Sequence, residues 1–195
     1  MYCIKGDSEY NFNVKSLDAD ISIQEYSRLP KNELYIILDN LRSAFNVGSI
    51  FRLCDSLRVA GLYLCGYTAH PPHKKLEKTS LGTLEFVPWR HFPETENAVR
   101  ELQRNGIPVW SVETVTGAVP YTEASYPRAL GLVFGNEALG VDKRVIQQCD
   151  QSVEIPLMGF KNSLNVAVSC GIVSYQFINT QGRVKPVNST VPLEQ

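Results

Sequence analysis

The sequence has no long apolar run. Within its 195 residues, no stretch approaches the roughly 20 consecutive apolar residues that a membrane-spanning helix requires. The N-terminal segment MYCIKGDSEY also lacks the basic and then apolar order of a signal peptide. We therefore expect a protein without a membrane segment that functions in the cytoplasm.

Regularly spaced cysteines are also absent. The cysteines are odd in number, scattered and without a CxxC pair: Cys3, Cys54, Cys65, Cys149 and Cys170. A disulfide framework or a zinc site requires paired or closely spaced cysteines. We expect free thiols in a reducing compartment and no bound metal.

Two nucleotide-binding fingerprints are missing. The chain has no dinucleotide-binding glycine motif, and its most similar segment to a phosphate loop is VFGNEALGVDK at 133–143. The Walker pattern needs Lys and then Ser or Thr directly after its last glycine, whereas Val141 and Asp142 follow Gly140. Binding of a nucleoside triphosphate is therefore disfavoured.

The net charge of -1 hides a basic segment. Between residues 41 and 91, seven Arg or Lys outnumber three acids, and all three histidines (His70, His73 and His91) lie in the same segment. A local basic patch attracts phosphates even when the whole protein is slightly acidic. Charge alone is equally consistent with an ordinary solvated surface.

Apolar runs and helical spacing alternate along the chain. We expect strands at 34–39, 62–66, 107–113, 129–134 and 152–156, and helices at 47–57, 94–105, 141–149 and 163–179. Gly61 is expected to end the first of these helices, and 67–82 to form a long exposed loop. This alternation predicts an α/β fold with a mainly parallel sheet flanked by helices. The expected organisation is a short N-terminal extension (1–32), one domain (33–179) and a C-terminal tail (180–195).

Three polar segments follow predicted strands, where parallel sheets place their ligands. In the first, Asn46 is expected to cap a helix that carries Gly48 and Arg52. The second contains Gly135, Glu137 and Gly140. In the third, Ser163 is expected to cap the last helix, with Asn165 just inside it. Each segment taken alone is more often just a turn or an ordinary cap.

Together, the three segments resemble the successive motifs of the SpoU/TrmH branch of the SPOUT methyltransferases. The frame N-x-G-x-I-x-R is present from Asn46 to Arg52, and G-x-E with a later glycine from Gly135 to Gly140. The third motif is present as Ile155-Pro156-Leu157-Met158-Gly159 followed by Ser163-Leu164-Asn165-Val166. Residues 78–89 also resemble the stretch between the first two motifs. The resemblance covers about 33–179.

The resemblance implies a C-terminal deep trefoil knot, a homodimer, and methyl transfer from S-adenosylmethionine to a ribose 2'-hydroxyl of tRNA or rRNA. It assigns catalysis to Arg52, Asn46, Glu137, Ser163 and Asn165. Cofactor binding falls to Glu113, Thr114, Gly135, Ile155, Met158 and Leu164. The basic segment would bind RNA through Arg42, Arg58, Lys74, Lys75 and Lys78.

The role of Arg52 has two interpretations. The family assigns this arginine the part of a base, but an arginine is almost never deprotonated in proteins. We therefore favour an anchor for the adjoining phosphate that also stabilises developing alkoxide charge. Two alternative functions are a catalytically silent RNA-binding protein that retains the knotted fold and an α/β enzyme acting on a small molecule. Retention of the whole motif set argues against the first, and the missing nucleotide fingerprints against the second.

Overall fold

One sheet of seven strands forms the centre of the protein, and every neighbouring pair of strands runs parallel. The computed structural model describes residues 21–181. The strand order is β3-β2-β1-β6-β4-β7-β5, which confirms the predicted α/β class with a mainly parallel sheet. The strands are β1 (Asn32–Asp39), β2 (Val59–Cys65), β3 (Trp89–Phe92), β4 (Val109–Val112), β5 (Val119–Pro120), β6 (Leu130–Phe134) and β7 (Gln151–Glu154).

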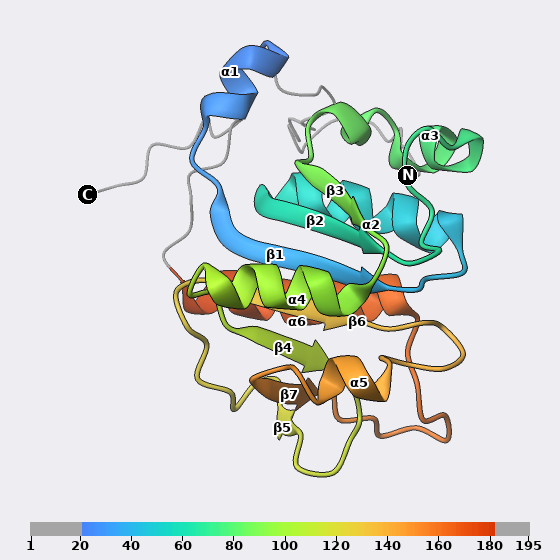
Figure 1. The fold of residues 1–195 in the computed structure, drawn as a ribbon, viewed down its shortest axis with the longest axis vertical. Helices are drawn as coiled ribbons and strands as arrows, with labels where there is room; N and C mark the ends of the chain where they lie inside the picture. Colours follow the sequence, from blue (N-terminus) through green and yellow to red (C-terminus); the bar gives the residue numbers. More distant parts are fainter. Residues whose placement is uncertain (1–20, 182–195) are drawn as a thin grey trace, which may run out of the picture.

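Helices cover both faces of the sheet (Figure 1). One face carries α2 (Ala44–Leu57) and α6 (Val166–Thr180), with α3 (Lys74–Ser80) packed on α2. The opposite face carries α4 (Thr95–Arg104) and α5 (Lys143–Ile146), while α1 (Ile23–Arg28) precedes β1 and a short 3-10 turn spans Thr83–Glu85. Among residues 21–181, every helix is too short or too polar to cross a bilayer.

The central strand β1 is buried on both sides because its apolar residues serve two cores. Ile36 and Leu38 pack with Val47 and Phe51 of α2 in one cluster. Ile37 packs with the α4 side in the second cluster. Successive side chains of a strand point to opposite faces of the sheet, so an uninterrupted apolar run is what a strand covered on both faces requires.

The boundaries of α2 differ from those predicted. Ser43, and not Asn46, caps the helix, because the Ser43 hydroxyl accepts the Asn46 N–H at 3.3 Å. The helix ends at Arg58, which adopts a left-handed conformation with φ of 47°. Gly61 was expected to end it, but Gly61 lies inside β2. Predicting this end from Gly61 was wrong because a non-glycine residue took the left-handed position.

The prediction of a loop over 67–82 was also wrong in part, because α3 occupies 74–80. A side chain at Gly48 would place its Cβ only 2.0 Å from the Thr79 hydroxyl oxygen. Gly48 therefore permits the close approach of α2 and α3, as its place in the motif suggested.

The remaining differences concern element ends and edges. Asn165 caps α6 by accepting the Ala167 N–H at 2.9 Å, so the expected cap at Ser163 was wrong. The helix predicted over 141–149 is confined to α5, and the edge strands β3 and β5 were not predicted. Most of the expected N-terminal extension and nearly all of the expected tail lie outside the described residues.

Candidate functional site

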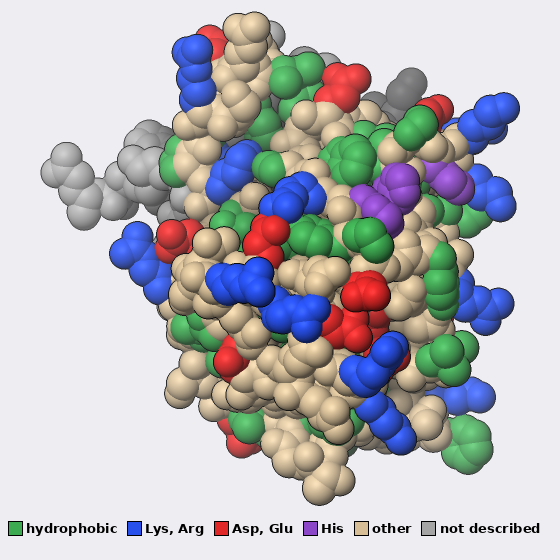
Figure 2. Space-filling model, in the orientation of Figure 1, with side chains coloured by type: hydrophobic (Ala, Val, Ile, Leu, Met, Phe, Trp, Pro, Cys, Tyr) green, Lys and Arg blue, Asp and Glu red, His purple; other side chains and the backbone are tan. Residues whose placement is uncertain are grey.

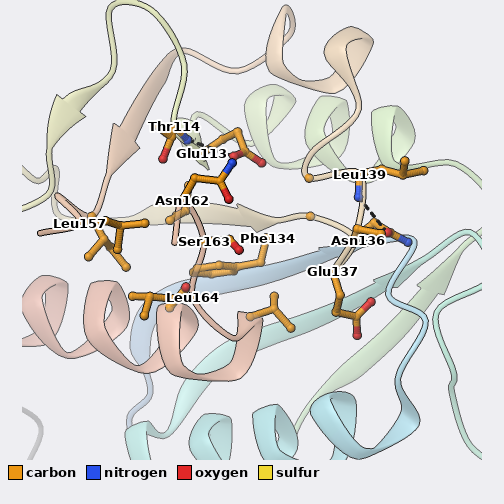
Figure 3. Close-up of a pocket in the computed structure, with 17 residues that line it drawn as sticks. Glu113, Thr114, Phe134, Asn136, Glu137, Leu139, Leu157, Asn162, Ser163 and Leu164 are labelled. Carbon is orange, nitrogen blue, oxygen red and sulfur yellow. Dashed lines mark hydrogen bonds between the residues drawn. The ribbon is translucent and has the colours of Figure 1, made fainter. Parts of the chain in front are cut away.

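A cavity of about 320 Å³ opens at the carboxyl ends of β4, β6 and β7 (Figure 3). Its volume lies within the range of about 300–1,000 Å³ that is typical of small-molecule pockets. Three loops and the first turns of α6 supply its walls. The lining residues are Val112, Glu113, Thr114, Phe134, Gly135, Asn136, Glu137, Ala138, Leu139, Gly140, Ile155, Leu157, Asn162, Ser163, Leu164, Val166 and Ser169.

The loop after β6 is closed on itself. Asn136 and Gly140 exchange two backbone hydrogen bonds of 3.0 and 2.9 Å. A Cβ at Gly135 would lie 2.1 Å from the backbone of Gly140 and Val141, and Gly140 has a φ of 72°, a conformation that favours glycine. Both glycines are thus required for a turn that brings backbone groups to the cavity wall.

Asn136 holds this loop against its neighbours, although sequence reasoning assigned it no role. Its side-chain amide donates to the Asn40 carbonyl and to the Tyr67 hydroxyl, both at 2.7 Å. Its side-chain carbonyl accepts the N–H groups of Ala138 and Leu139. The only sequence signal was a polar residue two positions after a buried strand. Asn136 is 6% exposed, so its amide needs these partners.

Glu113 connects the end of β4 to the same loop. Its carboxylate accepts the Thr114 N–H and the Val141 N–H, each at 3.0 Å. A Cβ at Gly140 would lie 2.3 Å from that carboxylate. Glu113 and Thr114, which the resemblance placed near the cofactor, both line the cavity (Figure 3).

Glu137 joins the second motif to the first. Its carboxylate accepts the backbone N–H of Arg42 at 2.8 Å and of Ser43 at 3.0 Å, and the Asn46 side-chain amide at 2.9 Å. Partial burial raises the pKa of this carboxyl. The hydrogen bonds, led by that from Arg42, outweigh burial and set the pKa below its ordinary value.

Asn46 extends this network to the third motif. The Asn165 side-chain amide donates to the Asn46 side-chain oxygen at 3.1 Å, while the Asn165 oxygen caps α6. The apolar neighbours of Asn165 suggested that it is buried in the helix, but its side chain is exposed. One chain of hydrogen bonds therefore connects Glu137, Asn46 and Asn165, three of the five residues expected to act in catalysis.

The other two expected catalytic residues lie apart from this chain. Ser163 lines the cavity, whereas Arg52 does not. Arg52 is exposed on α2 in line with Phe45 and Ser49, since residues three and four apart share a helix face. Within residues 21–181, its guanidinium makes no hydrogen bond or ion pair with another side chain, so it is available to a ligand.

The expected cofactor residues divide in the same way. Gly135, Ile155 and Leu164 line the cavity beside Glu113 and Thr114. Met158 does not line it, and its side chain is 92% exposed. Leu157, Asn162 and Ser169 line it without having been predicted; within the motif sequence they had no distinguishing signal.

Some cations of the basic segment are exposed at the surface, whereas others are buried or paired within the fold. Arg42, Lys74, Lys75 and Lys78 are exposed. Arg58 is only 8% exposed, so it is poorly placed to contact RNA, and Arg90 pairs with Glu101 of α4. In Figure 2, Lys and Arg side chains project from the edge at which the strands of Figure 1 end, with the histidines close by.

Comparisons with known proteins agree on one family. The model of the SpoU rRNA methylase family matches residues 33–175. A tRNA (guanosine(18)-2'-O)-methyltransferase of Thermus thermophilus is 27% identical over 154 residues, which are 79% of this chain and 78% of that protein.

Two solved structures resemble the fold closely. An AdoMet-bound rRNA methyltransferase from Sinorhizobium meliloti has a TM-score of 0.72 at 26% identity, covering 80% of this chain and 59% of that one. A TrmH/SpoU tRNA-modifying enzyme from A. aeolicus has a TM-score of 0.71 at 26% identity, covering 80% of this chain and 79% of that one. This chain thus spans about three fifths of the S. meliloti protein.

Proposed function

The chain belongs to the SpoU rRNA methylase family, and from this membership we propose that it transfers a methyl group from S-adenosylmethionine to a ribose 2'-hydroxyl of RNA. The observation that carries the proposal is that the second and third motif segments line one cavity, while Asn46 of the first motif is hydrogen-bonded to both, to Glu137 and to Asn165. A protein that only bound RNA would have no need of this arrangement.

The residues around the cavity fit S-adenosylmethionine. Ile155, Leu157 and Leu164 offer apolar surface for an adenine ring, and the Glu113 carboxylate and the Ser163 hydroxyl offer polar partners. The two glycines at the ends of the Gly135–Gly140 turn carry no side chain and contribute backbone groups to the cavity wall. When bound, S-adenosylmethionine supplies a methyl group on a positively charged sulfur, which a hydroxyl oxygen can attack.

The protein's own groups would position the ribose hydroxyl and stabilise the negative charge that develops on its oxygen. An arginine is almost never deprotonated in proteins, so we assign Arg52 to the phosphate beside the target ribose, where it also stabilises negative charge developing on the hydroxyl oxygen. The proton leaves to phosphate or water. Glu137 and Asn46 hold the first turn of α2, and Arg52 projects from the same helix about two turns further along.

The substrate class follows from the relatives and from the surface. The T. thermophilus relative acts on tRNA and the S. meliloti protein on rRNA by name. Here, Arg42, Lys74, Lys75 and Lys78 would contact the RNA backbone, contacts that position a substrate without specifying its sequence.

The partner of the exposed apolar face on α6 is, in our proposal, a second copy of the chain. Val168 and Tyr175 are 50% and 49% exposed and lie seven residues apart, so they share one face of α6, and Leu164, which is 43% exposed, directly precedes the cap of that helix. Exposed apolar patches of this kind mark interfaces. Val168→Glu should convert a dimer to a monomer in sedimentation velocity, and a monomeric wild-type protein would refute the dimer. The trefoil knot stays a prediction.

Calorimetric titration with S-adenosylmethionine tests the methyltransferase proposal. We expect saturable binding to the wild-type protein. Incubation with labelled S-adenosylmethionine and total RNA, followed by mapping of the labelled nucleotide, should then locate a 2'-O-methyl group. Cofactor binding without any transfer would favour the silent RNA-binding alternative, and absence of cofactor binding would remove the methyltransferase proposal.

Substitution of two α3 lysines tests the RNA surface. The double substitution Lys74→Ala and Lys75→Ala should weaken RNA binding. It should also make the slope of the logarithm of affinity against the logarithm of salt concentration shallower, because each lost phosphate contact removes about 0.7–0.9 from that slope. S-adenosylmethionine affinity should not change, because neither lysine lines the cavity. Lys143→Ala, an exposed lysine of α5, is the control. An unchanged RNA affinity would assign these lysines to solvent alone.

A further inference from the structure

Four aromatic rings lie beyond the catalytic cavity: Tyr67 and His70 follow β2, and Trp89 and His91 lie on β3. The ring centroids of His70 and His91 are 4.3 Å apart, and His70 is stacked on Trp89 at 6.4 Å. The fourth ring is Tyr67, which is 62% exposed. We name Tyr67, His70, Trp89 and His91 the aromatic shelf.

Backbone hydrogen bonds fix the orientation of the two imidazoles. His91 Nε2 lies 3.0 Å from the Gly66 carbonyl, and His70 Nδ1 lies 3.1 Å from the Pro71 carbonyl. A carbonyl only accepts, so both nitrogens carry the proton. Each ring is held at one edge while His91 stays exposed. Packing of the sheet requires neither an exposed histidine nor an exposed tyrosine here.

The shelf is continuous with the catalytic cavity. The Tyr67 hydroxyl accepts the side-chain amide of Asn136, a residue of the cavity wall, at 2.7 Å. The Tyr67 backbone N–H donates to the side chain of Asn40, in the loop after β1, at 3.3 Å. Because Gly66 precedes Tyr67 and binds His91, one short segment connects cavity and shelf.

Positive charge borders the shelf. The helix α3 begins four residues after His70, and it carries three exposed lysines, Lys74, Lys75 and Lys78. Figure 2 shows the histidines beside Lys and Arg side chains. Within residues 21–181, no group of three His, Cys, Asp or Glu side chains is arranged to hold a metal ion. Aromatic rings flanked by cations are the combination that binds single-stranded nucleic acid.

We propose that the aromatic shelf stacks an unpaired base of the RNA substrate next to the nucleotide that is methylated. This rests on the proposed function in taking RNA as the substrate and the nucleotide at the cavity as the one that is methylated. The lysines hold the backbone while the shelf selects RNA in which the neighbouring base is unstacked, so the shelf favours loops over duplexes. Loss of one such stack weakens binding by about 5- to 150-fold.

Anisotropy titration of a short fluorescein-labelled single-stranded RNA tests the shelf. His91→Ala and His70→Ala should each weaken binding by at least about 5-fold, whereas His91→Phe, which keeps a ring, should stay within about twofold. The salt slope should remain that of the wild type, because a stacked base releases no counterions. Binding of a blunt RNA duplex should be unaffected by any of these substitutions.

Three results would overturn the shelf: wild-type affinity in both alanine variants, equal losses for His91→Ala and His91→Phe, or a reduced salt slope, which would show a charge contact. Calorimetric titration of every variant with S-adenosylmethionine checks the fold, since none of these histidines lines the cavity. The same titration of the wild type separates the two proposals. If the wild type binds S-adenosylmethionine but the substitutions leave RNA affinity unchanged, only the proposed role of the aromatic shelf is refuted.

Discussion

Glu137 offers the sharpest test of the site because its carboxylate holds two motif segments together. Replacing it with Ala removes the acceptors of the Arg42 N–H, the Ser43 N–H and the Asn46 side-chain amide. Replacing it with Gln keeps one oxygen acceptor but turns an NH₂ group toward donors that need an acceptor. Both substitutions should loosen the first turn of α2 without creating a cavity in the core.

The magnitude follows from the exposure of the carboxylate. A hydrogen bond to a charged group contributes about 1.5–3 kcal/mol when shielded from water, but Glu137 is exposed, so water competes for the donors and screening reduces each bond. Loss of a helix cap costs about 1 kcal/mol. We expect Glu137→Ala to lower the free energy of unfolding by about 1–2 kcal/mol and Glu137→Gln by about half of that.

The lowered pKa of Glu137 predicts the direction in which the effect of the substitution changes with pH. Because the folded pKa of Glu137 lies below its ordinary value of 4.5, the charged carboxylate stabilises the fold above that value. This stabilisation is lost as pH falls through the folded pKa. The difference in free energy of unfolding between wild type and Glu137→Gln should therefore narrow from about pH 7 to below about pH 4.

Urea unfolding followed by circular dichroism measures this difference at each pH. Glu123→Gln, which replaces an exposed carboxylate in the loop after β5, serves as the control. A difference that stays constant to well below about pH 4, or that is absent at about pH 7, would refute a structural role for the charge on Glu137.

Three further outcomes are expected. Gly135→Ala should lower the free energy of unfolding by about 1–3 kcal/mol, because its Cβ would meet backbone at 2.1 Å. The control Gly159→Ala, in the loop after β7 with nothing within 4 Å of its Cβ, should change the free energy of unfolding by less than about 0.5 kcal/mol, and similar urea midpoints for the two variants would contradict the close approach. Arg52→Lys should reduce kcat by about tenfold or more in methyl-transfer assays without changing S-adenosylmethionine affinity, and near-normal turnover would show that a bidentate guanidinium is not needed. Because burial raises the pKa of the Cys54 thiol and raises that of Cys170 to about 12, both should resist iodoacetamide until the protein unfolds, as read by mass spectrometry of the peptides; rapid labelling of the native protein would be the contrary result.

Much of the fold could be read from local pattern. The apolar run at 34–39 predicted β1 because a strand covered on both faces shows no alternation, and the acids and glycine around 94–106 marked α4. The edge strands β3 and β5 escaped prediction because they span only 89–92 and 119–120, too short to establish a period. The 74–80 helix was hidden by lysines and polar residues beside two prolines.

The candidate site shows the same division. Motif order and spacing picked out Glu137, Asn46 and Asn165, and the structure shows them hydrogen-bonded in series. Asn136 was not picked out, because a buried polar residue is recognised by its partners and those partners are distant in sequence. Arg58 was grouped with the RNA-binding cations because its sequence neighbourhood is basic, and only its burial argues otherwise.

By itself, the sequence determined the class of fold, the family and the residue types at the three motifs, because these depend on periodicity and on spacing over a few residues. Only the tertiary structure decided which of those residues meet, which cations face solvent, and that an aromatic shelf adjoins the cavity. The physical reason is distance along the chain: the Glu137 carboxylate accepts an N–H from a residue 95 positions away. Such contacts exist only once parallel strands have brought their carboxyl ends to one edge of the sheet.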